Sequence, residues 1–232
     1  MWASGFHCST GTSMHVRTIP LPLRVNTCSV LVGLLSWAGA SLLWADTATV
    51  AAESPAAQVA FRAWLNTPAA ANAQAYLSDL QHHTRQPLSL FELTYNRHPA
   101  PADCPYALFA IPPKTQWKNL VPALHILDQL HDRHLIKTFR IISVYRDPTA
   151  NRCVQGSKKS QHLLHHAIDF QVPPDRPNAS ISTAAQLCQF WKTQGRALNL
   201  GLGVYDQNRF HIDGSGYRTW GLDHRRASSP CS

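Results

Sequence analysis

The stretch SQHLLHHAIDFQV, residues 160–172, concentrates three histidines and one aspartate in a segment that becomes apolar at its end. His162 precedes the apolar segment and Asp169 lies within it, while His211 lies in a second apolar stretch, RFHID. Imidazole nitrogens and carboxylate oxygens are zinc ligands, and a catalytic zinc site takes three protein ligands and keeps one position open. Each residue alone is more often structural, but their joint occurrence makes the three candidates for one metal site.

The segments that would carry these residues are predicted to be β-strands. Residues 166–172 alternate into a strand that contains Asp169. Residues 137–146, KTFRIISVYR, are rich in β-branched side chains and are followed by the turn signal DPTAN, which predicts a buried strand. Two further strands, 200–207 and 209–214, are joined by a tight polar turn, and the second of them carries the last candidate histidine.

Two helices are predicted to flank these strands. Leucines at helical spacing make residues 117–135 the clearest amphipathic helix, and residues 183–195 predict another that ends at a glycine cap. The strands and helices follow one another without a regular βαβ repeat. We therefore predict the α+β class, with a small, mostly antiparallel sheet flanked by helices.

An Ala-rich region before the main domain predicts a short helical N-terminal extension. Residues 56–83 have helical spacing interrupted by Pro68, which predicts two short helices. The Pro-rich stretch 97–117 then marks a boundary. We divide this part of the chain into a helical extension and linker, residues 46–100, and a main domain, residues 101–232.

Residues 1–45 have the layout of a secretory signal peptide. Arg17 and Arg24 precede a nearly uncharged run from Cys28 to Ala45, and acidic and small residues follow. An uncleaved membrane anchor is the alternative, although the run is somewhat shorter than the roughly 20 residues that a spanning helix needs. We expect an exported protein, periplasmic or secreted, that associates with a membrane only if this segment is retained.

The charge of the expected mature chain favours an anionic partner. Residues 1–45 contain two basic and no acidic residues, so 19 Lys and Arg remain against 13 Asp and Glu, a formal charge of +6. A bacterial cell wall and a nucleic acid would both suit this charge. The basic residues are scattered and are not interleaved with aromatic residues as in single-strand binders, so we expect no nucleic-acid partner.

Four cysteines remain after residue 45, and none is spaced as C-x-x-C. An even number in an exported chain predicts two disulfides rather than a zinc knuckle. Three connectivities are possible. We favour Cys104 with Cys153 and Cys188 with Cys231, although the sequence leaves the pairing open.

Three segments resemble the family of zinc D-Ala-D-Ala carboxypeptidases and related murein endopeptidases, whose fold also occurs in the Hedgehog signalling domain. SQHLLHHAIDF resembles the family signature SxHxxGxAxD, and the upstream SVYRDPTAN resembles SGYRxPxxN. The downstream GLGVYDQNRFHIDGSGYRTWG is similar to the G-x-G-x-Y, FVHxD and RxW ending of the murein endopeptidase branch. The three segments follow in the family order from about Lys114 to Gly221, which makes the resemblance more specific than any one motif.

The resemblance implies one zinc ion per chain, held by His162, Asp169 and His211. It also implies that Ser160 places a hydroxyl near the site and that Arg146 lies at the mouth of the pocket. Members of the family use the matching arginine to hold the substrate's carboxylate or a backbone carbonyl. A guanidinium suits that role because its planar fork meets a carboxylate with two hydrogen bonds.

The sequence departs from the family pattern at two positions. His165 stands where the family usually has glycine, so this histidine or His166 could line the pocket or face solvent. Asn208 stands where better-known members have the Glu or Asp that accepts a proton from the attacking water, which an amide cannot do. Asp213 lies on the same strand face as the last ligand, two residues on, and could act as the base or orient that ligand; Asp206 is the fallback base.

The resemblance implies an exported, zinc-dependent peptidase that hydrolyses peptidoglycan stem peptides or their crosslinks, and we expect it to be a monomer. Asn208 supports an alternative, a non-catalytic zinc-bearing domain of the same fold that binds the cell wall. The dispersal of the 13 histidines argues against a metal carrier.

Overall fold

The computed structural model describes residues 53–98 and 103–232. The predicted signal peptide, residues 1–45, lies outside the described residues, as does part of the predicted linker. Among the residues that the structure describes, none of the helices has both the length and the apolar character needed to cross a membrane.

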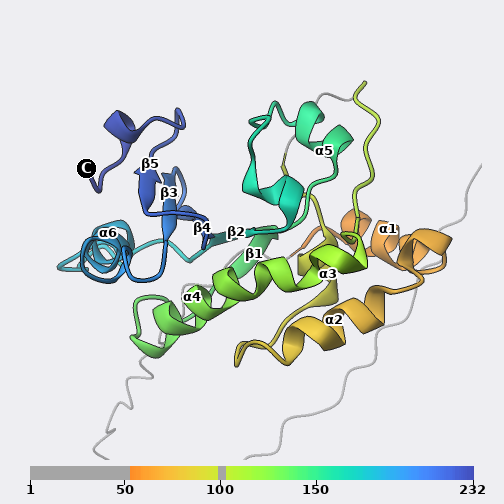
Figure 1. The fold of residues 1–232 in the computed structure, drawn as a ribbon, viewed down its shortest axis with the longest axis horizontal. Coiled ribbons are helices and arrows are strands. Elements are labelled where there is room, and N and C mark those ends of the chain that lie inside the picture. The colour runs from red at the N-terminus through yellow and green to blue at the C-terminus, as the bar shows by residue number, and fades with distance from the viewer. Residues whose placement is uncertain (1–52, 99–102) are drawn as a thin grey trace, which may run out of the picture. The chain divides into compact units, whose positions relative to one another are not determined.

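A five-stranded sheet forms the centre of the fold in the order β1-β2-β4-β3-β5 (Figure 1). All neighbouring strands are antiparallel except β3 and β5, which are parallel. The prediction of an α+β fold with a mostly antiparallel sheet is therefore confirmed. The strands are β1 (Arg140–Ser143), β2 (Ala167–Gln171), β3 (Gly201–Tyr205), β4 (Arg209–Asp213) and β5 (Arg218–Trp220).

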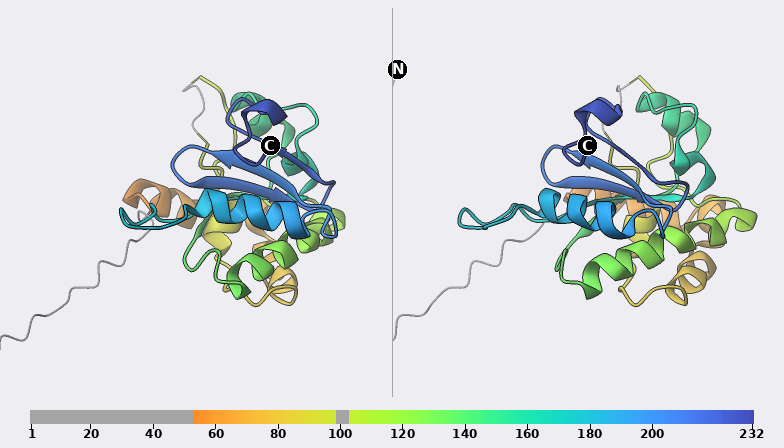
Figure 2. Two further views of the ribbon diagram at one scale, coloured as in Figure 1. Left: turned by 90° about the vertical axis from the view of Figure 1, so that its left-hand side faces the viewer. Right: turned by 60° about the vertical axis from the view of Figure 1, so that its left-hand side comes forward.

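The two faces of this sheet differ in chemistry because successive side chains on a strand point to opposite sides. Ile168 and Phe170 of β2 and Phe210 and Ile212 of β4 are at most 1% exposed and belong to the hydrophobic core. The helices α4 (Val121–Asp132) and α6 (Thr183–Gln194) lie on one side of the sheet (Figure 2). The short helix α5 (Pro148–Cys153) and the C-terminal segment lie on the other side.

The N-terminal helices share the core of the sheet domain. Helix α1 (Pro55–Leu65) ends before Pro68, and α2 (Ala73–Gln81) and α3 (Leu90–Thr94) follow it, in agreement with the two helices predicted for residues 56–83. Tyr76 and Leu80 of α2 are fully buried in the core cluster that also contains the apolar residues of β2 and β4. The extension therefore contributes part of the domain's interior.

Two disulfides join distant segments, Cys104 with Cys153 and Cys188 with Cys231. These are the pairs that the sequence analysis favoured. The first ties the segment after the N-terminal helices to the end of α5, and the second ties α6 to the C-terminus.

Candidate metal centre

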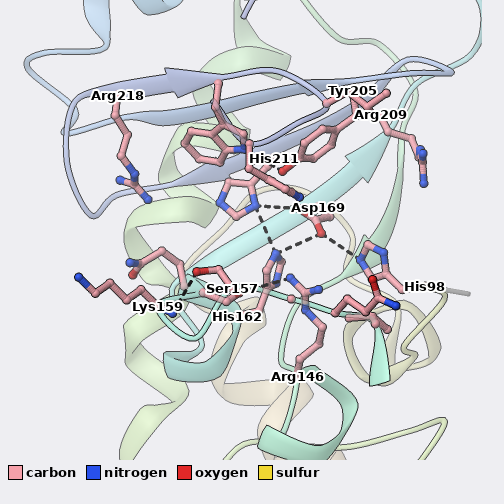
Figure 3. A pocket seen from close by; sticks show the side chains of 18 of the residues that line it. His98, Arg146, Ser157, Lys159, His162, Asp169, Tyr205, Arg209, His211 and Arg218 are labelled. Atoms are coloured by element: carbon pink, nitrogen blue, oxygen red, sulfur yellow. Dashed lines mark hydrogen bonds and ion pairs between the residues drawn. The ribbon is translucent and has the colours of Figure 1, made fainter. Parts of the chain in front are cut away.

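A cavity of about 460 Å³ opens on the sheet face that carries the polar residues, and the candidate ligands form its floor (Figure 3). One wall consists of residues 154–161, which follow α5, and the other consists of residues 218–226, which include β5. Both candidate histidines and the candidate aspartate line this cavity. The site thus lies in a cleft with access from solvent.

Strand pairing brings Asp169 and His211 together. Asp169 on β2 is directly opposite His211 on β4, and both side chains point to the polar face. His162 lies in the short 3-10 helix Gln161–Leu164 that precedes β2. One ligand atom from each residue lies within 4.8 Å of those of the other two, and all three residues are buried. The structure therefore brings all three predicted ligands to one place.

Hydrogen bonds to the outer ring nitrogens fix the tautomers of the two histidines. His162 Nδ1 donates to the carbonyl oxygen of Val144 at 2.6 Å, and His211 Nε2 donates to Oδ2 of Asp213 at 2.9 Å. The remaining nitrogens, Nε2 of His162 and Nδ1 of His211, are 3.2 Å apart and face the carboxylate of Asp169. Three lone-pair donors therefore converge on one point, which is the arrangement that a cation requires.

The pKa shifts agree with an anionic, cation-binding centre. Burial, with Arg146 nearby, lowers the pKa of His162 to about 4, so this imidazole is neutral at pH 7. Burial opposes ionisation of Asp169, but charge attraction and hydrogen bonds from the histidines outweigh it and hold the pKa of that carboxyl well below its usual range. For His211, burial is outweighed by the hydrogen bonds to Asp169 and Asp213, which raise its pKa.

Asp213 is directed away from the cavity and supports His211 from behind. Its side chain is fully buried, and Arg218 donates to both carboxylate oxygens at 3.0 and 2.7 Å. The backbone N–H of Ser215 also donates to it, at 2.8 Å. Of the two roles that the sequence left open for Asp213, this geometry favours the orientation of His211 over proton transfer in the cavity.

Arg146 is placed to bind an anion. It lines the cavity and is 8% exposed, and its Nη2 donates to Ser160 Oγ at 3.4 Å. Its Nε is buried and has no hydrogen-bond partner among the described residues. The structure therefore places Arg146 beside the candidate metal ligands, with the hydroxyl of Ser160 next to it, as predicted.

The departures from the family pattern have structural roles. Asn208 lies in the β3–β4 turn with a positive φ of 53°, and its side-chain amide donates to the carbonyl oxygen of Pro173 at 3.1 Å. His165 has a φ of 59°, a left-handed conformation that explains why glycine suits this position. His165 is fully buried and bonds to the hydroxyl of Tyr76 and the carbonyl of Gln116. Neither His165 nor His166 lines the cavity. The expectation that His165 could line the pocket or face solvent is therefore wrong, because its side chain is buried in the core.

Two aromatic residues that the sequence analysis quoted only within motifs, without a role, complete the cavity. The ring of Trp220 packs against that of His211 with centroids 5.0 Å apart, and its Nε1 donates to the hydroxyl of Tyr205 at 2.9 Å. A Cβ at Gly203 would lie 2.8 Å from the Trp220 ring, so glycine is needed for this packing. The glycine and tyrosine of the G-x-G-x-Y motif are the signals that could have pointed to this wall.

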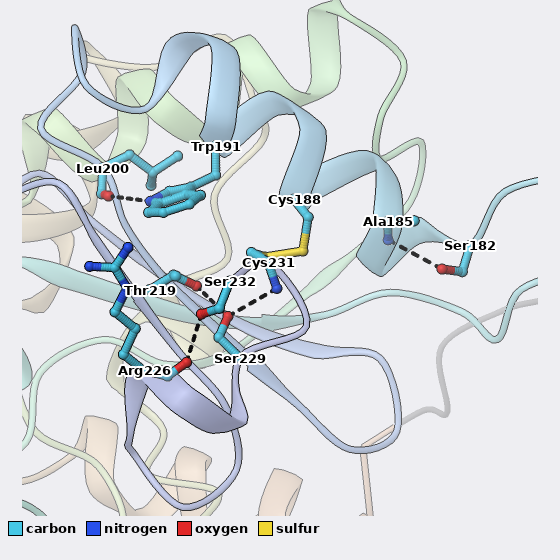
Figure 4. The surroundings of a disulfide bond; sticks show 10 residues. All are labelled: Ser182, Ala185, Cys188, Trp191, Leu200, Thr219, Arg226, Ser229, Cys231 and Ser232. Carbon is cyan, nitrogen blue, oxygen red and sulfur yellow. Dashed lines mark hydrogen bonds between the residues drawn. A yellow bond between two sulfur atoms is a disulfide. The ribbon is translucent and has the colours of Figure 1, made fainter.

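The cavity wall of residues 218–226, which carries Trp220, is followed by a C-terminal segment that is bonded to α6 (Figure 4). The hydroxyl groups of Thr219 and Ser229 are 2.6 Å apart, and Ser229 Oγ also accepts from the backbone N–H of Cys231 at 3.2 Å. The disulfide of Cys231 with Cys188 then joins this segment covalently to the helix. The wall of residues 218–226 is therefore held in place by residues that do not belong to the metal site.

A sequence model of the family described as Peptidase M15 matches residues 108–213, a range that contains the three candidate ligands and Arg146. This match agrees with the motif order and with the converging ligand atoms. Residues 108–213 are therefore similar in sequence to the Peptidase M15 family. No curated protein and no solved structure matches the chain.

The residues of the M15 site fit the zinc ion on which this metallopeptidase family depends. Two imidazole nitrogens and one carboxylate form a donor set that suits zinc, and a zinc ion held by these three ligands would keep one coordination position for water or substrate. Val144 and Asp213 hold the outer nitrogens of the histidines, as outer hydrogen-bond partners of zinc ligands commonly do. His162, Asp169 and His211 are therefore the residues that would hold the metal.

Proposed function

We propose that this chain is an exported zinc-dependent peptidase that hydrolyses peptidoglycan stem peptides or their crosslinks, as D-Ala-D-Ala carboxypeptidases or murein endopeptidases do. The observation that carries the proposal is the cluster of His162, Asp169 and His211 on the floor of a cleft inside the M15 range. Zinc bound by such a set would activate a water molecule and polarise a carbonyl oxygen. Periplasmic or secreted location is part of the proposal, and the two disulfides support it.

The charge of the cavity supports an anionic peptide as substrate. Asp169 is the only carboxylate among the described lining residues, and the five cations that line the cavity are Arg146, Lys159, Arg209, Arg218 and Arg226. Peptidoglycan stem peptides carry free carboxylates, which this lining would attract. The two-pronged guanidinium of Arg146 would hold one of them beside the metal ligands.

Tyr205 offers the substrate a hydrogen-bond donor. Its hydroxyl lines the cavity, and burial raises its pKa above the usual value, so the phenol keeps its proton at neutral pH. The hydroxyl oxygen already accepts from Trp220, which leaves its O–H free to donate. We assign Tyr205 to bind a peptide oxygen and thereby orient the scissile bond.

A second candidate function is a non-catalytic, zinc-bearing domain that binds the cell wall. Asn208 favours it, because its amide cannot accept a proton and is held by Pro173 in a turn outside the cavity. The buried pairing of Asp213 with Arg218 also favours the binding function, because it directs this carboxylate away from the cavity.

Purified muropeptides distinguish the two functions. We expect the chain without its first 45 residues to release D-Ala or open crosslinks, to lose this activity with a chelator, and to regain it with zinc. Metal analysis should give one zinc per chain, and His211→Ala should lose most of it while remaining folded. A zinc-loaded wild type that binds muropeptides but cleaves none of them would establish the binding function instead.

A further inference from the structure

His98 reaches the metal centre from outside the M15 range. Its Nε2 lies 3.1 Å from Oδ2 of Asp169, and its side chain lines the cavity with 22% of its surface exposed (Figure 3). The family match begins at residue 108, whereas His98 lies in the segment that follows the N-terminal helices. No motif in the sequence marks this histidine.

The residues around His98 hold its backbone in place. The neighbouring Arg97 forms an ion pair with Glu53 and donates to the carbonyl oxygen of Ile141 in β1. The hydroxyl of Tyr106 donates to the carbonyl oxygen of His98 at 3.3 Å. The approach of His98 to Asp169 is therefore anchored to the sheet through Arg97.

The chemistry of the contact identifies His98 as the donor. A carboxylate that binds a metal can only accept hydrogen bonds, so the 3.1 Å contact with Asp169 Oδ2 requires Nε2 of His98 to carry the proton. Asp169 Oδ1 faces His211 Nδ1 at 2.8 Å, while Oδ2 lies 3.1 Å from His162 Nε2 and 3.1 Å from His98 Nε2. A hydrogen bond from an outer side chain helps to fix the orientation of a carboxylate that binds a metal.

We propose that His98 is a positioning residue that orients Asp169 for zinc binding, so that the N-terminal extension is part of the metal centre. This inference rests on the proposed zinc site. His98 is not assigned as a ligand, because its imidazole hydrogen-bonds only to Asp169 among the described residues and lies outside the group of three residues whose ligand atoms converge. Asp213 supports His211 in a similar way. There the outer carboxylate accepts a hydrogen bond from the candidate ligand, whereas His98 donates one to the candidate ligand.

The test is the zinc affinity of the chain from residue 46 onward, measured by competition with a chromophoric chelator. We expect His98→Ala to weaken zinc binding about 10–100-fold, the usual cost of losing an outer partner of a ligand. His98→Gln, whose amide can still donate to Asp169, should recover part of the loss. His125→Ala, which removes an exposed histidine of α4, is the matched control and should bind zinc like the wild type.

Cobalt substitution tests the positioning role separately from folding and activity. The visible spectrum of cobalt-loaded His98→Ala should keep the intensity of the wild type, because the number of ligands is unchanged. An intensity change that indicates a lost ligand would overturn the proposal, as would zinc affinity in His98→Ala equal to that of the wild type. Equal weakening in the Ala and Gln variants would also overturn it. A wild type that binds no zinc would instead overturn the proposed function, and this inference with it.

Discussion

His211 Nε2 lies 2.9 Å from Asp213 Oδ2, on the side of the imidazole opposite the nitrogen that faces Asp169 and His162. The imidazole of His211 is therefore clamped between two carboxylates. The Asp213 carboxylate is itself held by the guanidinium of Arg218, which forms part of the cavity wall. This chain of contacts connects the wall of the cleft to a metal ligand.

Asp213→Asn should therefore weaken zinc binding rather than abolish the chemistry. We expect the zinc affinity to fall about 10–100-fold, because the ring of His211 loses its charged acceptor. Saturating zinc should restore most of the turnover. Arg218→Gln, which loosens Asp213 but keeps its carboxylate, should give a smaller loss of zinc affinity. Unchanged zinc affinity with turnover reduced about 10²–10⁴-fold would identify Asp213 as a general base instead.

Arg146→Lys should impair substrate binding without changing zinc content. Lysine keeps the charge but cannot form the paired hydrogen bonds that a guanidinium makes with a carboxylate. Charge-assisted bonds contribute about 1.5–3 kcal/mol each, so we expect kcat/KM to fall roughly 10–100-fold. Steady-state kinetics on a muropeptide, with metal analysis of the same sample, checks this. A parallel loss of zinc would show that Arg146 supports His162 rather than the substrate.

The cations that line the cleft should make activity dependent on ionic strength. The double variant Lys159→Gln with Arg209→Gln should lower kcat/KM about tenfold at low salt, at the lower end of the range for electrostatic steering. The difference from wild type should vanish near 1 M salt, where the screening length is about 3 Å. Lys192→Gln, on the exposed side of α6, is the control. A deficit that persists at high salt would mean that these side chains act through contact rather than through charge.

His165 should make the protein less stable as the pH falls from about 6.5 to about 4. Burial lowers the pKa of His165 to about 4, whereas a histidine in the unfolded chain has a pKa of about 6.5. In that window the unfolded chain takes up a proton that the folded chain does not, so the free energy of unfolding decreases, by about 3 kcal/mol at most. Metal-free His165→Asn cannot titrate and tolerates the left-handed backbone. Its urea stability should fall less steeply with pH, and equal slopes would contradict the prediction.

The parts of the site that local pattern determines could be predicted from the sequence. Apolar alternation placed Asp169 and His211 on strands, and their residue types and motifs predicted that they are metal ligands. Asp213 could be placed on the right face by the two-residue period, but its role depended on Arg218, which follows in a different strand. The ring contact of Trp220 with His211 likewise depends on the parallel pairing of β3 with β5, which nothing in the local sequence specifies.

The contributions of the N-terminal extension could not be predicted, because they arise from tertiary packing. His98 meets Asp169 across 71 positions of sequence, and Tyr76 meets His165 across 89. The alternation and spacing of local segments carry no information about such pairs. Local patterns also carry no information about packing across the boundary predicted near residue 100. Tyr76 and Leu80, which precede it, are buried together with the apolar residues of the sheet, which follow it.

The two disulfides fasten the two walls of the cleft, because Cys153 precedes one wall directly and Cys231 follows the other. The zinc ligands, in contrast, are held by strand pairing and by backbone hydrogen bonds that need no oxidation. A chain with reduced cysteines would therefore possess its candidate ligands before it possesses a shaped cleft. If the chain is exported as proposed, we expect thiol oxidation to complete the cleft, so that the reduced chain is less active than the oxidised one.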